Sequence, residues 1–171
     1  MTMTAGRMRL EAATPENVRY VAERMRESDF REFSAVSYAR DRRQLAELMT
    51  KIYGEHPGGI CAYSGDEPVA IGAMVEGRPN VVTLMFFATE ALNEIAIPLT
   101  RFIRGTLFPQ YREEGIHRIE CISIDGHTAA HRWIRLLGLE RETGPMLGYG
   151  KNGETFYQFS WTRDAGTTGN A

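Results

Sequence analysis

Apolar and polar positions in the first third of the chain follow the period of helices after one short strand. Residues 8–12 predict the strand, and Thr14 then supplies a helix N-cap that is followed by a proline and an acidic residue. Helices are therefore expected over residues 15–25 and 28–38. A third helix is expected after Asp41, because the glutamine three residues later matches a capping box. Its apolar positions on one helical face are Leu45, Leu48, Met49 and Ile52.

The pattern then changes to short apolar runs that are separated by turn residues. Pro57-Gly58-Gly59 ends the third helix. The first two runs flank Ser64-Gly65-Asp66-Glu67, which is a hairpin signature, and a second turn follows at residues 77–80. We therefore expect three consecutive antiparallel strands. The runs span residues 60–63, 68–75 and 81–88.

A long helical stripe of apolar residues follows Thr89 and reaches to about Tyr111. Pro98 interrupts this stripe. Because proline has no backbone N–H, Pro98 is expected to kink the helix near its first turns, unless the regular helix begins only at Pro98. The stripe consists of Leu92, Ile95, Ala96, Leu99, Phe102, Ile103 and Leu107.

The last third of the chain predicts a strand, a helix and two more strands. Residues 117–123 alternate as a strand, and Asp125-Gly126 opens a helix that Gly138 ends in the left-handed conformation. The two final strands are expected to flank residues 151–154, where an Asn-Gly pair favours a tight hairpin. The apolar positions of the helix are Ala130, Trp133, Ile134 and Leu137.

Length and composition match an ordinary globular protein and exclude several classes. The chain has 171 residues, of which 43% are hydrophobic and 25% charged, so we expect one domain over residues 1–163 and a disordered tail over residues 164–171. The net charge of −2 argues against a protein that binds nucleic acid through bulk charge. Apolar runs of about eight residues are too short for a membrane-spanning helix. Residues 1–10 have no apolar core of a secretory signal, so we expect a cytoplasmic protein.

The chain contains two cysteines, Cys61 and Cys121. Each lies in an apolar, strand-like stretch, and their spacing does not match a metal site. We expect both to be buried free thiols.

The order of elements is strand, two or three helices, three strands, helix, strand, helix and two strands, which resembles the GNAT N-acetyltransferase family over almost the whole chain. A sharper resemblance lies in residues 127–139, His-Thr-Ala-Ala-His-Arg-Trp-Ile-Arg-Leu-Leu-Gly-Leu. The family motif has an asparagine, an alanine three residues on, a Leu-Tyr pair and a terminal Gly-Phe. Aligned on the glycine, His127 stands at the asparagine, Ala130 at the alanine and Ile134 at the tyrosine. In many members that tyrosine protonates the departing CoA thiolate.

This resemblance implies an α/β (α+β) GNAT fold. Its central sheet is expected to be mixed, mostly antiparallel, of about six or seven strands and flanked by helices.

The same resemblance implies acetyl-CoA as the acyl donor. The family splays its fourth strand, here residues 81–88, from the fifth so that pantetheine pairs with the exposed backbone. Its phosphate-binding glycine loop corresponds to residues 88–94, which contain no glycine. Alternatively, Thr89 and the acidic residues after it are an ordinary helix N-cap and first turn that need no ligand. The Met-Phe-Phe sequence in the strand can likewise be part of the hydrophobic core instead of a donor contact. The predicted donor contacts are Met85, Phe86, Phe87, Ala88, Thr89, Glu90, Asn93, Ala130 and His131. Four arginines face either the 3′-phosphoadenosine or solvent, namely Arg101, Arg104, Arg132 and Arg135.

Amine acetylation needs a base for the substrate ammonium and a donor for the carbonyl oxygen. Asp125 and His127 are favoured as the catalytic residues, because both lie where the family's fifth strand gives way to its fourth helix. Asp125 is alternatively an N-cap, and His127 and His131 are alternatively solvent-exposed. The two histidines also resemble a metal pair, but Thr128 stands where a metalloprotease has glutamate, so no metal is predicted. The other acids considered are Glu76, Glu90 and Glu120.

Two functions are consistent with these residues. The first is acetyl-CoA-dependent transfer of an acetyl group to a primary amine of a small molecule or a protein. The second is a catalytically inactive, structural or interacting protein, since residues 138–142, 144–150 and 152–154 resemble GNAT-like proteins of bacteriophages and prophages, several of which also lack the glycine loop. Its partners would then be virion proteins, and its location the virion. A third possibility is a regulatory module that binds CoA without catalysing a reaction. Exposed strand edges would also allow a homodimer.

Overall fold

The computed structural model describes residues 3–5 and 8–163. The prediction of a disordered tail over residues 164–171 lies outside these residues. Within the described part of the chain, no helix is long and apolar enough to cross a membrane.

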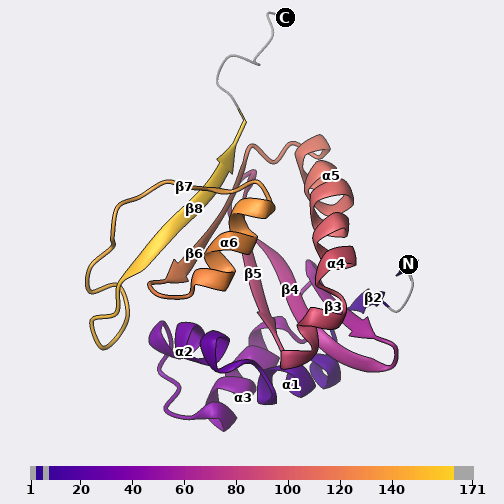
Figure 1. The fold of residues 1–171 in the computed structure, drawn as a ribbon, viewed down its shortest axis with the longest axis horizontal. Coiled ribbons are helices and arrows are strands. Elements are labelled where there is room, and N and C mark those ends of the chain that lie inside the picture. Colours follow the sequence, from indigo (N-terminus) through magenta and orange to yellow (C-terminus); the bar gives the residue numbers. More distant parts are fainter. Residues whose placement is uncertain (1–2, 6–7, 164–171) are drawn as a thin grey trace, which may run out of the picture.

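One mixed sheet forms the centre of the molecule (Figure 1), in the order β1-β2-β3-β4-β5-β6-β8-β7. Among the strands of the described residues, only the β5–β6 pair is parallel, and the other neighbours are antiparallel. This confirms the predicted mixed, mostly antiparallel sheet. The described residues form eight strands rather than six or seven, since the sheet includes two very short strands, β1 with three residues and β7 with two. The strands are β1 (Met3–Ala5), β2 (Met8–Ala12), β3 (Gly59–Ser64), β4 (Glu67–Arg78), β5 (Val81–Ala88), β6 (Arg118–Ile124), β7 (Glu140–Arg141) and β8 (Phe156–Thr162).

Three helices follow β2, and they begin close to the predicted caps. Thr14 and Asn17 form a reciprocal capping box at the first helix, and the Asp41 carboxylate accepts the Gln44 N–H at the third. The predicted apolar face of the third helix is partly wrong, because Ile52 is 48% exposed while Ala46 takes its place against the core. The helices are α1 (Pro15–Glu23), α2 (Glu27–Ala35) and α3 (Arg42–Tyr53).

Replacing Asp41 with alanine is expected to lower the free energy of unfolding by about 1 kcal/mol, since the first turn of α3 loses the acceptor for one of its unpaired N–H groups. Chemical denaturation measures the change. Lys51→Ala, at an exposed position of the same helix, is the control, and an equal loss in both variants would contradict a capping role for Asp41.

The predicted long helix after Thr89 is divided into four segments. The regular helix begins at Ala96, two residues before Pro98, so neither alternative for this proline holds as stated. Pro98 lies in the first turn, where no intrahelical donor is needed. A π-turn follows, closed by a bond from the Phe108 N–H to the Ile103 carbonyl. It precedes Pro109, which has no N–H to donate, and this accounts for the interruption. The segments are the 3₁₀-helix η1 (Glu90–Glu94), α4 (Ala96–Phe102), η2 (Ile103–Leu107) and α5 (Phe108–Glu113).

The helices cover the two faces of the sheet separately. Side chains of α1 and α3 pack with Met85 and Phe87 of β5, whereas α4, η2, α5 and the late helix α6 (Thr128–Leu136) pack with Leu84 and Ala88 of the same strand. Figure 1 shows α1–α3 grouped together, apart from α4, α5 and α6. Consecutive β5 residues therefore face different helical layers, as the pleat of a strand requires.

The C-terminal hairpin differs from its prediction. The turn at residues 150–154 is present, with Gly153 at a φ of 89°, but the strand before it is only an isolated bridge from Met146 to Phe156. The paired strand β7 lies further back in the chain. Lys151 explains the difference, because its N–H and its ammonium bind the carbonyls of Ala35 and Ala39 and so hold the loop on the end of α2.

The parallel pair β5–β6 separates soon after it begins. Pairing is confined to residues 81–83 of β5 and 118–120 of β6. At its far end β5 instead meets the start of α2, where the Arg26 N–H donates to the Ala88 carbonyl and Met25 bridges to Thr89. The sheet is therefore split between its two central strands, and α2 lies against the split.

Candidate active site in the split sheet

A cavity of about 480 Å³ passes through the sheet at this split. Leu84, Met85 and Phe86, which are consecutive on β5, all line it, and so do Cys121 and Ile122 on β6. Consecutive strand residues point to opposite faces. The cavity therefore connects the two faces of the sheet between β5 and β6.

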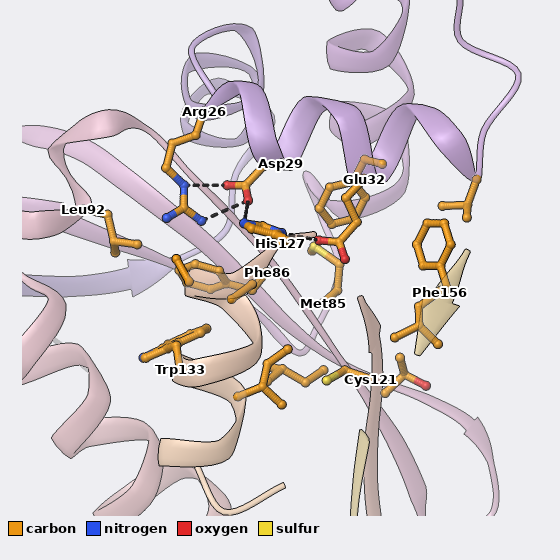
Figure 2. A pocket seen from close by; sticks show the side chains of 18 of the residues that line it. Arg26, Asp29, Glu32, Met85, Phe86, Leu92, Cys121, His127, Trp133 and Phe156 are labelled. Atoms are coloured by element: carbon orange, nitrogen blue, oxygen red, sulfur yellow. Dashed lines mark hydrogen bonds and ion pairs between the residues drawn. The ribbon is translucent and has the colours of Figure 1, made fainter. Parts of the chain in front are cut away.

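Each side of the cavity has an apolar lobe, and the charged groups come from the start of α2 and from the turn before α6 (Figure 2). The α6-side lobe is lined by Leu92, Ala96, Leu99, Ala129, Ala130, Trp133 and Ile134. The α2-side lobe is lined by Phe33, Val36, Tyr53, Val75, Thr83, Ile122 and Phe156. Trp133 packs on Phe86, with 4.5 Å between ring centroids, and its indole N–H donates to Thr100, so it ties α6 to α4.

The first turn of α2 carries a buried ion pair. Arg26 donates two hydrogen bonds to Asp29, of 3.0 and 2.9 Å, and the Ala88 N–H donates a third of 2.9 Å. Asp29 is only 2% exposed, so burial raises the pKa of its carboxyl, while Arg26 and the Ala88 N–H act in the opposite direction. This pair attaches α2 to the free end of β5 and fixes the position of its next turn.

Glu32 lies one turn further along α2 and points toward the same space. Its Oε1 accepts the Ile124 N–H at 2.7 Å, and its Oε2 lies 3.3 Å from Nδ1 of His127. Asp29, Glu32 and the guanidinium of Arg26 share one helix face because they are spaced three residues apart. Among the described residues, helix α2 and its N-cap residue Arg26 thus supply the charged side chains of the cavity other than the histidine.

His127 lies between the two carboxylates (Figure 2) and is 7% exposed. Because Nδ1 faces Glu32, we assign its proton there, which leaves the lone pair on Nε2. Nε2 is 3.8 Å from Asp29 Oδ1, too far for a hydrogen bond but close enough to stabilise a positive charge on the ring. His127 is therefore oriented to accept a proton on Nε2. The alternative of a solvent-exposed His127 is wrong.

Asp29, Glu32 and His127 also have the spacing of a metal site, since their ligand atoms lie within 4.8 Å of one another. Both oxygens of Asp29 already accept hydrogen bonds from Arg26, and one of them also accepts the Ala88 N–H, so Asp29 has little lone-pair capacity left to ligate a metal ion. Proton transfer through His127 is the chemistry that this arrangement favours.

The other predicted catalytic residue, Asp125, and His131 of the same motif lie outside the cavity. Asp125 is exposed, and it does not cap α6, because His127 occupies the N-cap position; the capping alternative is wrong. His131 is half-buried rather than exposed: its Nε2 bonds the Ile124 carbonyl, and its ring packs against Tyr157 and Phe159. Desolvation lowers the pKa of His131. Glu76 accepts the Asn80 N–H, Glu120 pairs with Arg118 and Arg78, and Glu90 is exposed.

The predicted donor contacts divide into two groups. Met85, Phe86 and Ala130 line the cavity. Phe87 is buried in the α1–α3 layer, where its ring meets Phe33, and Glu90 and Asn93 are exposed. The backbone N–H of Ala88 donates to Asp29, that of Thr89 donates to Val69, and the Thr89 hydroxyl caps η1 by accepting the Ala91 N–H.

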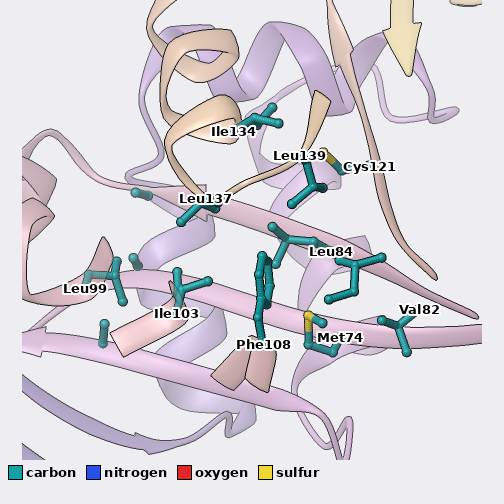
Figure 3. Close-up of a cluster of buried hydrophobic side chains, with 14 of the residues drawn as sticks. Met74, Val82, Leu84, Leu99, Ile103, Phe108, Cys121, Ile134, Leu137 and Leu139 are labelled. Atoms are coloured by element: carbon teal, nitrogen blue, oxygen red, sulfur yellow. The ribbon is translucent and has the colours of Figure 1, made fainter. Parts of the chain in front are cut away.

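Ile134, at the position of the family's tyrosine, faces the apolar core (Figure 3). It is 6% exposed and belongs to a buried cluster with Leu137, Leu139 and Cys121. Burial raises the pKa of the Cys121 thiol to about 12, and Cys61 is also buried and free, as predicted. None of these side chains supplies an acid or a nucleophile to the cavity at neutral pH.

Sequence reasoning missed Arg26, Asp29 and Glu32. Their spacing of three residues was the available signal, but an exposed amphipathic helix shows the same pattern. Only the contact of α2 with β5 and His127 distinguishes them from surface residues.

Comparison with known proteins shows the relationship of the fold. No protein-family model matches the chain, and no curated protein does. An acetyltransferase of the GNAT family from Bacillus anthracis superposes with a TM-score of 0.68 at 15% identity, over 95% of this chain and 98% of that one. The protein yncA from Salmonella typhimurium, solved with its cofactor acetyl-CoA, gives 0.66 at 15% identity over 97% and 99%. The ribosomal-protein-S18-alanine N-acetyltransferase from Escherichia coli gives 0.64 at 11% identity over 96% and 99%. The chain therefore has the fold of the GNAT acetyltransferases, as the element order predicted.

Proposed function

We propose that the protein is an acetyl-CoA-dependent N-acetyltransferase that acts on a primary amine. The observation that carries the proposal is the cavity through the split sheet, with a buried and oriented histidine between its two lobes. Transfer between two substrates needs a site that both can reach, and a passage connecting the faces of a sheet provides one. The GNAT fold and a structural neighbour solved with acetyl-CoA support the choice of donor.

The α6-side lobe suits the pantetheine arm of the donor. The backbone N–H of Ala88 donates to Asp29 and its C=O accepts the Arg26 N–H, so neither bonds to β4. In an antiparallel ladder every second residue directs its N–H and C=O to the same side, so those of Phe86 and Leu84 also point away from β4. Their N–H and C=O groups therefore point into the split, where an extended chain of amides can pair with them. Phe86 and Ala130 supply an apolar lining beside this edge.

The phosphate end of the donor fits less closely. The N–H groups of Ala88 and Thr89 are already used within the protein, and no glycine allows a close approach at residues 88–94. The predicted role of this loop in binding the diphosphate remains a prediction. Arg101, Arg104, Arg132 and Arg135 are exposed on α4, η2 and α6 and are the proposed contacts for the phosphates.

His127 acts as the general base in the proposed reaction. Nε2 takes one proton from the substrate ammonium, and Asp29 and Glu32 stabilise the imidazolium that results. The neutral amine nitrogen then bonds to the thioester carbonyl carbon, and the C–S bond breaks with its electron pair on sulfur. The proton that the nitrogen loses as the amide forms ends on the thiol, and His127 returns its own proton to solvent. Products are the acetamide, CoA and one proton.

A second candidate is a protein that keeps the GNAT fold without catalysis. The occupied N–H groups of Ala88 and Thr89 and the apolar residue Ile134 favour it. Protein partners would then replace the donor, and a phage origin would make them virion proteins. For the enzyme we propose a cytoplasmic location, where acetyl-CoA and amines are available.

Calorimetry with acetyl-CoA tests the proposal directly. We expect saturable binding with a dissociation constant at or below about 1 mM, and loss of that binding in Ala130→Trp, because the larger side chain fills the α6-side lobe. Thr128→Trp, two residues away and outside the cavity, is the matched control and should bind as the unchanged protein does. Absence of binding in the unchanged protein would refute the enzyme and favour the second candidate.

A further inference from the structure

We propose that the acceptor is a small primary amine carried on an apolar alkyl or aryl group, bound in the α2-side lobe. The inference rests on the proposed function and names the class of acceptor. It follows from the lining of the lobe, from its charge and from the size of the cavity.

Apart from Tyr53 and Thr83, which carry hydroxyls, the wall of the α2-side lobe consists of apolar side chains. Phe33 comes from α2, Val36 from its C-cap, Ile122 from β6 and Phe156 from β8, and Met85 faces them from β5. Phe156 is fully buried, and its far side is covered by the ring of Tyr149 at 5.1 Å between centroids. A polar or polycationic amine would lose its hydration here without replacement. An alkyl or aryl group instead gains by burial.

The charge at the inner end of the lobe matches one ammonium group. Two carboxylates, Asp29 and Glu32, lie beside His127, whereas a single guanidinium, that of Arg26, accompanies them, so the carboxylates outnumber the arginine by one. Arg26 is the one cation among the described residues that line the cavity, and Asp29 already pairs with it. A carboxylate next to the amine, as in an amino acid, would therefore meet like charge and no cation.

The loop before β8 packs behind Phe156, one of the wall residues of the lobe. Lys151 holds this loop on α2 through the carbonyls of Ala35 and Ala39, and Tyr149 rests on Phe156. Val36, at 46% exposure, marks the opening of the lobe. A cavity of about 480 Å³ that also receives the arm of the donor leaves room for a small molecule rather than for an extended peptide.

Binding and turnover of matched amines test this class. Phenethylamine and hexylamine are compared with ethanolamine, with phenylalanine, and with a peptide that begins with phenylalanine, by calorimetry without donor and by release of CoA thiol with acetyl-CoA. We expect the two apolar amines to bind and react with kcat/KM at least about tenfold above the others. If the polar amines or the peptide react better, the class is wrong while the acetyltransferase stands. If the apolar amines bind but are not acetylated, the acetyltransferase is wrong while the amine site stands. If no amine binds, the amine site is overturned.

Two variants separate recognition from folding. Glu32→Gln keeps an acceptor for the Ile124 N–H but removes the charge of the second carboxylate, so phenethylamine should bind about tenfold more weakly, with an unchanged melting temperature as the folding check. Val36→Lys places a charge at the opening, beside the apolar end of the bound amine, and should weaken binding of phenethylamine while leaving the affinity for acetyl-CoA unchanged. A merely structural role for this lobe would lower both affinities together, and that result would contradict the proposal.

Discussion

Replacing His127 with glutamine is expected to lower kcat/KM for acetyl transfer by about 10²- to 10⁴-fold, because the amide keeps a polar contact with Glu32 but cannot carry a proton. Affinity for acetyl-CoA should stay unchanged, since His127 contacts the carboxylates of α2 rather than the predicted path of the donor. Steady-state kinetics and calorimetry measure the two quantities separately, and together they distinguish loss of chemistry from loss of binding.

His131→Gln is the matched control for this prediction. His131 lies one turn later on the same helix, does not line the cavity, and binds the Ile124 carbonyl through a nitrogen that glutamine can replace. Its rate should stay within about threefold of the unchanged protein, a loss of less than 1 kcal/mol in transition-state stabilisation. Equal losses in the two variants would mean that α6 had been disturbed, and a fully active His127→Gln would remove His127 from the reaction.

Local patterns in the sequence were sufficient for most of the fold. Caps at Thr14 and Asp41, the change of period at residue 60 and the left-handed Gly138, with a φ of 95°, each depend on neighbours within a few residues. The π-turn after α4 was not predicted, because its apolar stripe continues unchanged through Ile103 and Leu107 and only the hydrogen-bond pattern differs. The late hairpin was misjudged because Lys151 bonds to a helix more than 100 residues earlier in the chain.

Whether Asp125 or His127 faces the candidate site depends on the turn at Gly126, just before α6. Gly126, with a φ of 83°, delays the start of α6 to Thr128, so His127 points into the split and Asp125 points away from it. A start one or two residues earlier would have exchanged their directions, and the sequence does not distinguish these registers. The partners of His127 could not be predicted for another reason, because Glu32 is 95 residues away from it in the sequence and the two meet only in the folded structure.

The largest effect on stability is expected at Arg26. Replacing it with methionine leaves Asp29, at 2% exposure, as a buried carboxylate without its counter-charge, and should lower the free energy of unfolding by about 3 kcal/mol. Chemical denaturation measures this. Arg43→Met provides the control, because Arg43 pairs with Glu47 on the exposed side of α3 and should cost no more than about 0.5 kcal/mol.

The dependence on pH identifies the cause of that loss. Burial raises the pKa of Asp29 above its value in the unfolded chain, so the folded state holds this proton more tightly. The contribution of Asp29 to stability is therefore complete below the unfolded pKa and is lost as the pH rises through the folded one. Without Arg26 the pKa of Asp29 rises further, so the deficit of Arg26→Met should be greatest at neutral pH and shrink as acid neutralises the carboxyl. Arg26→Met combined with Asp29→Asn, which retains an acceptor for the Ala88 N–H, should recover part of the loss at pH 7. A deficit that stayed constant with pH, with no recovery in the double variant, would attribute the cost to lost packing of the Arg26 side chain rather than to a buried charge.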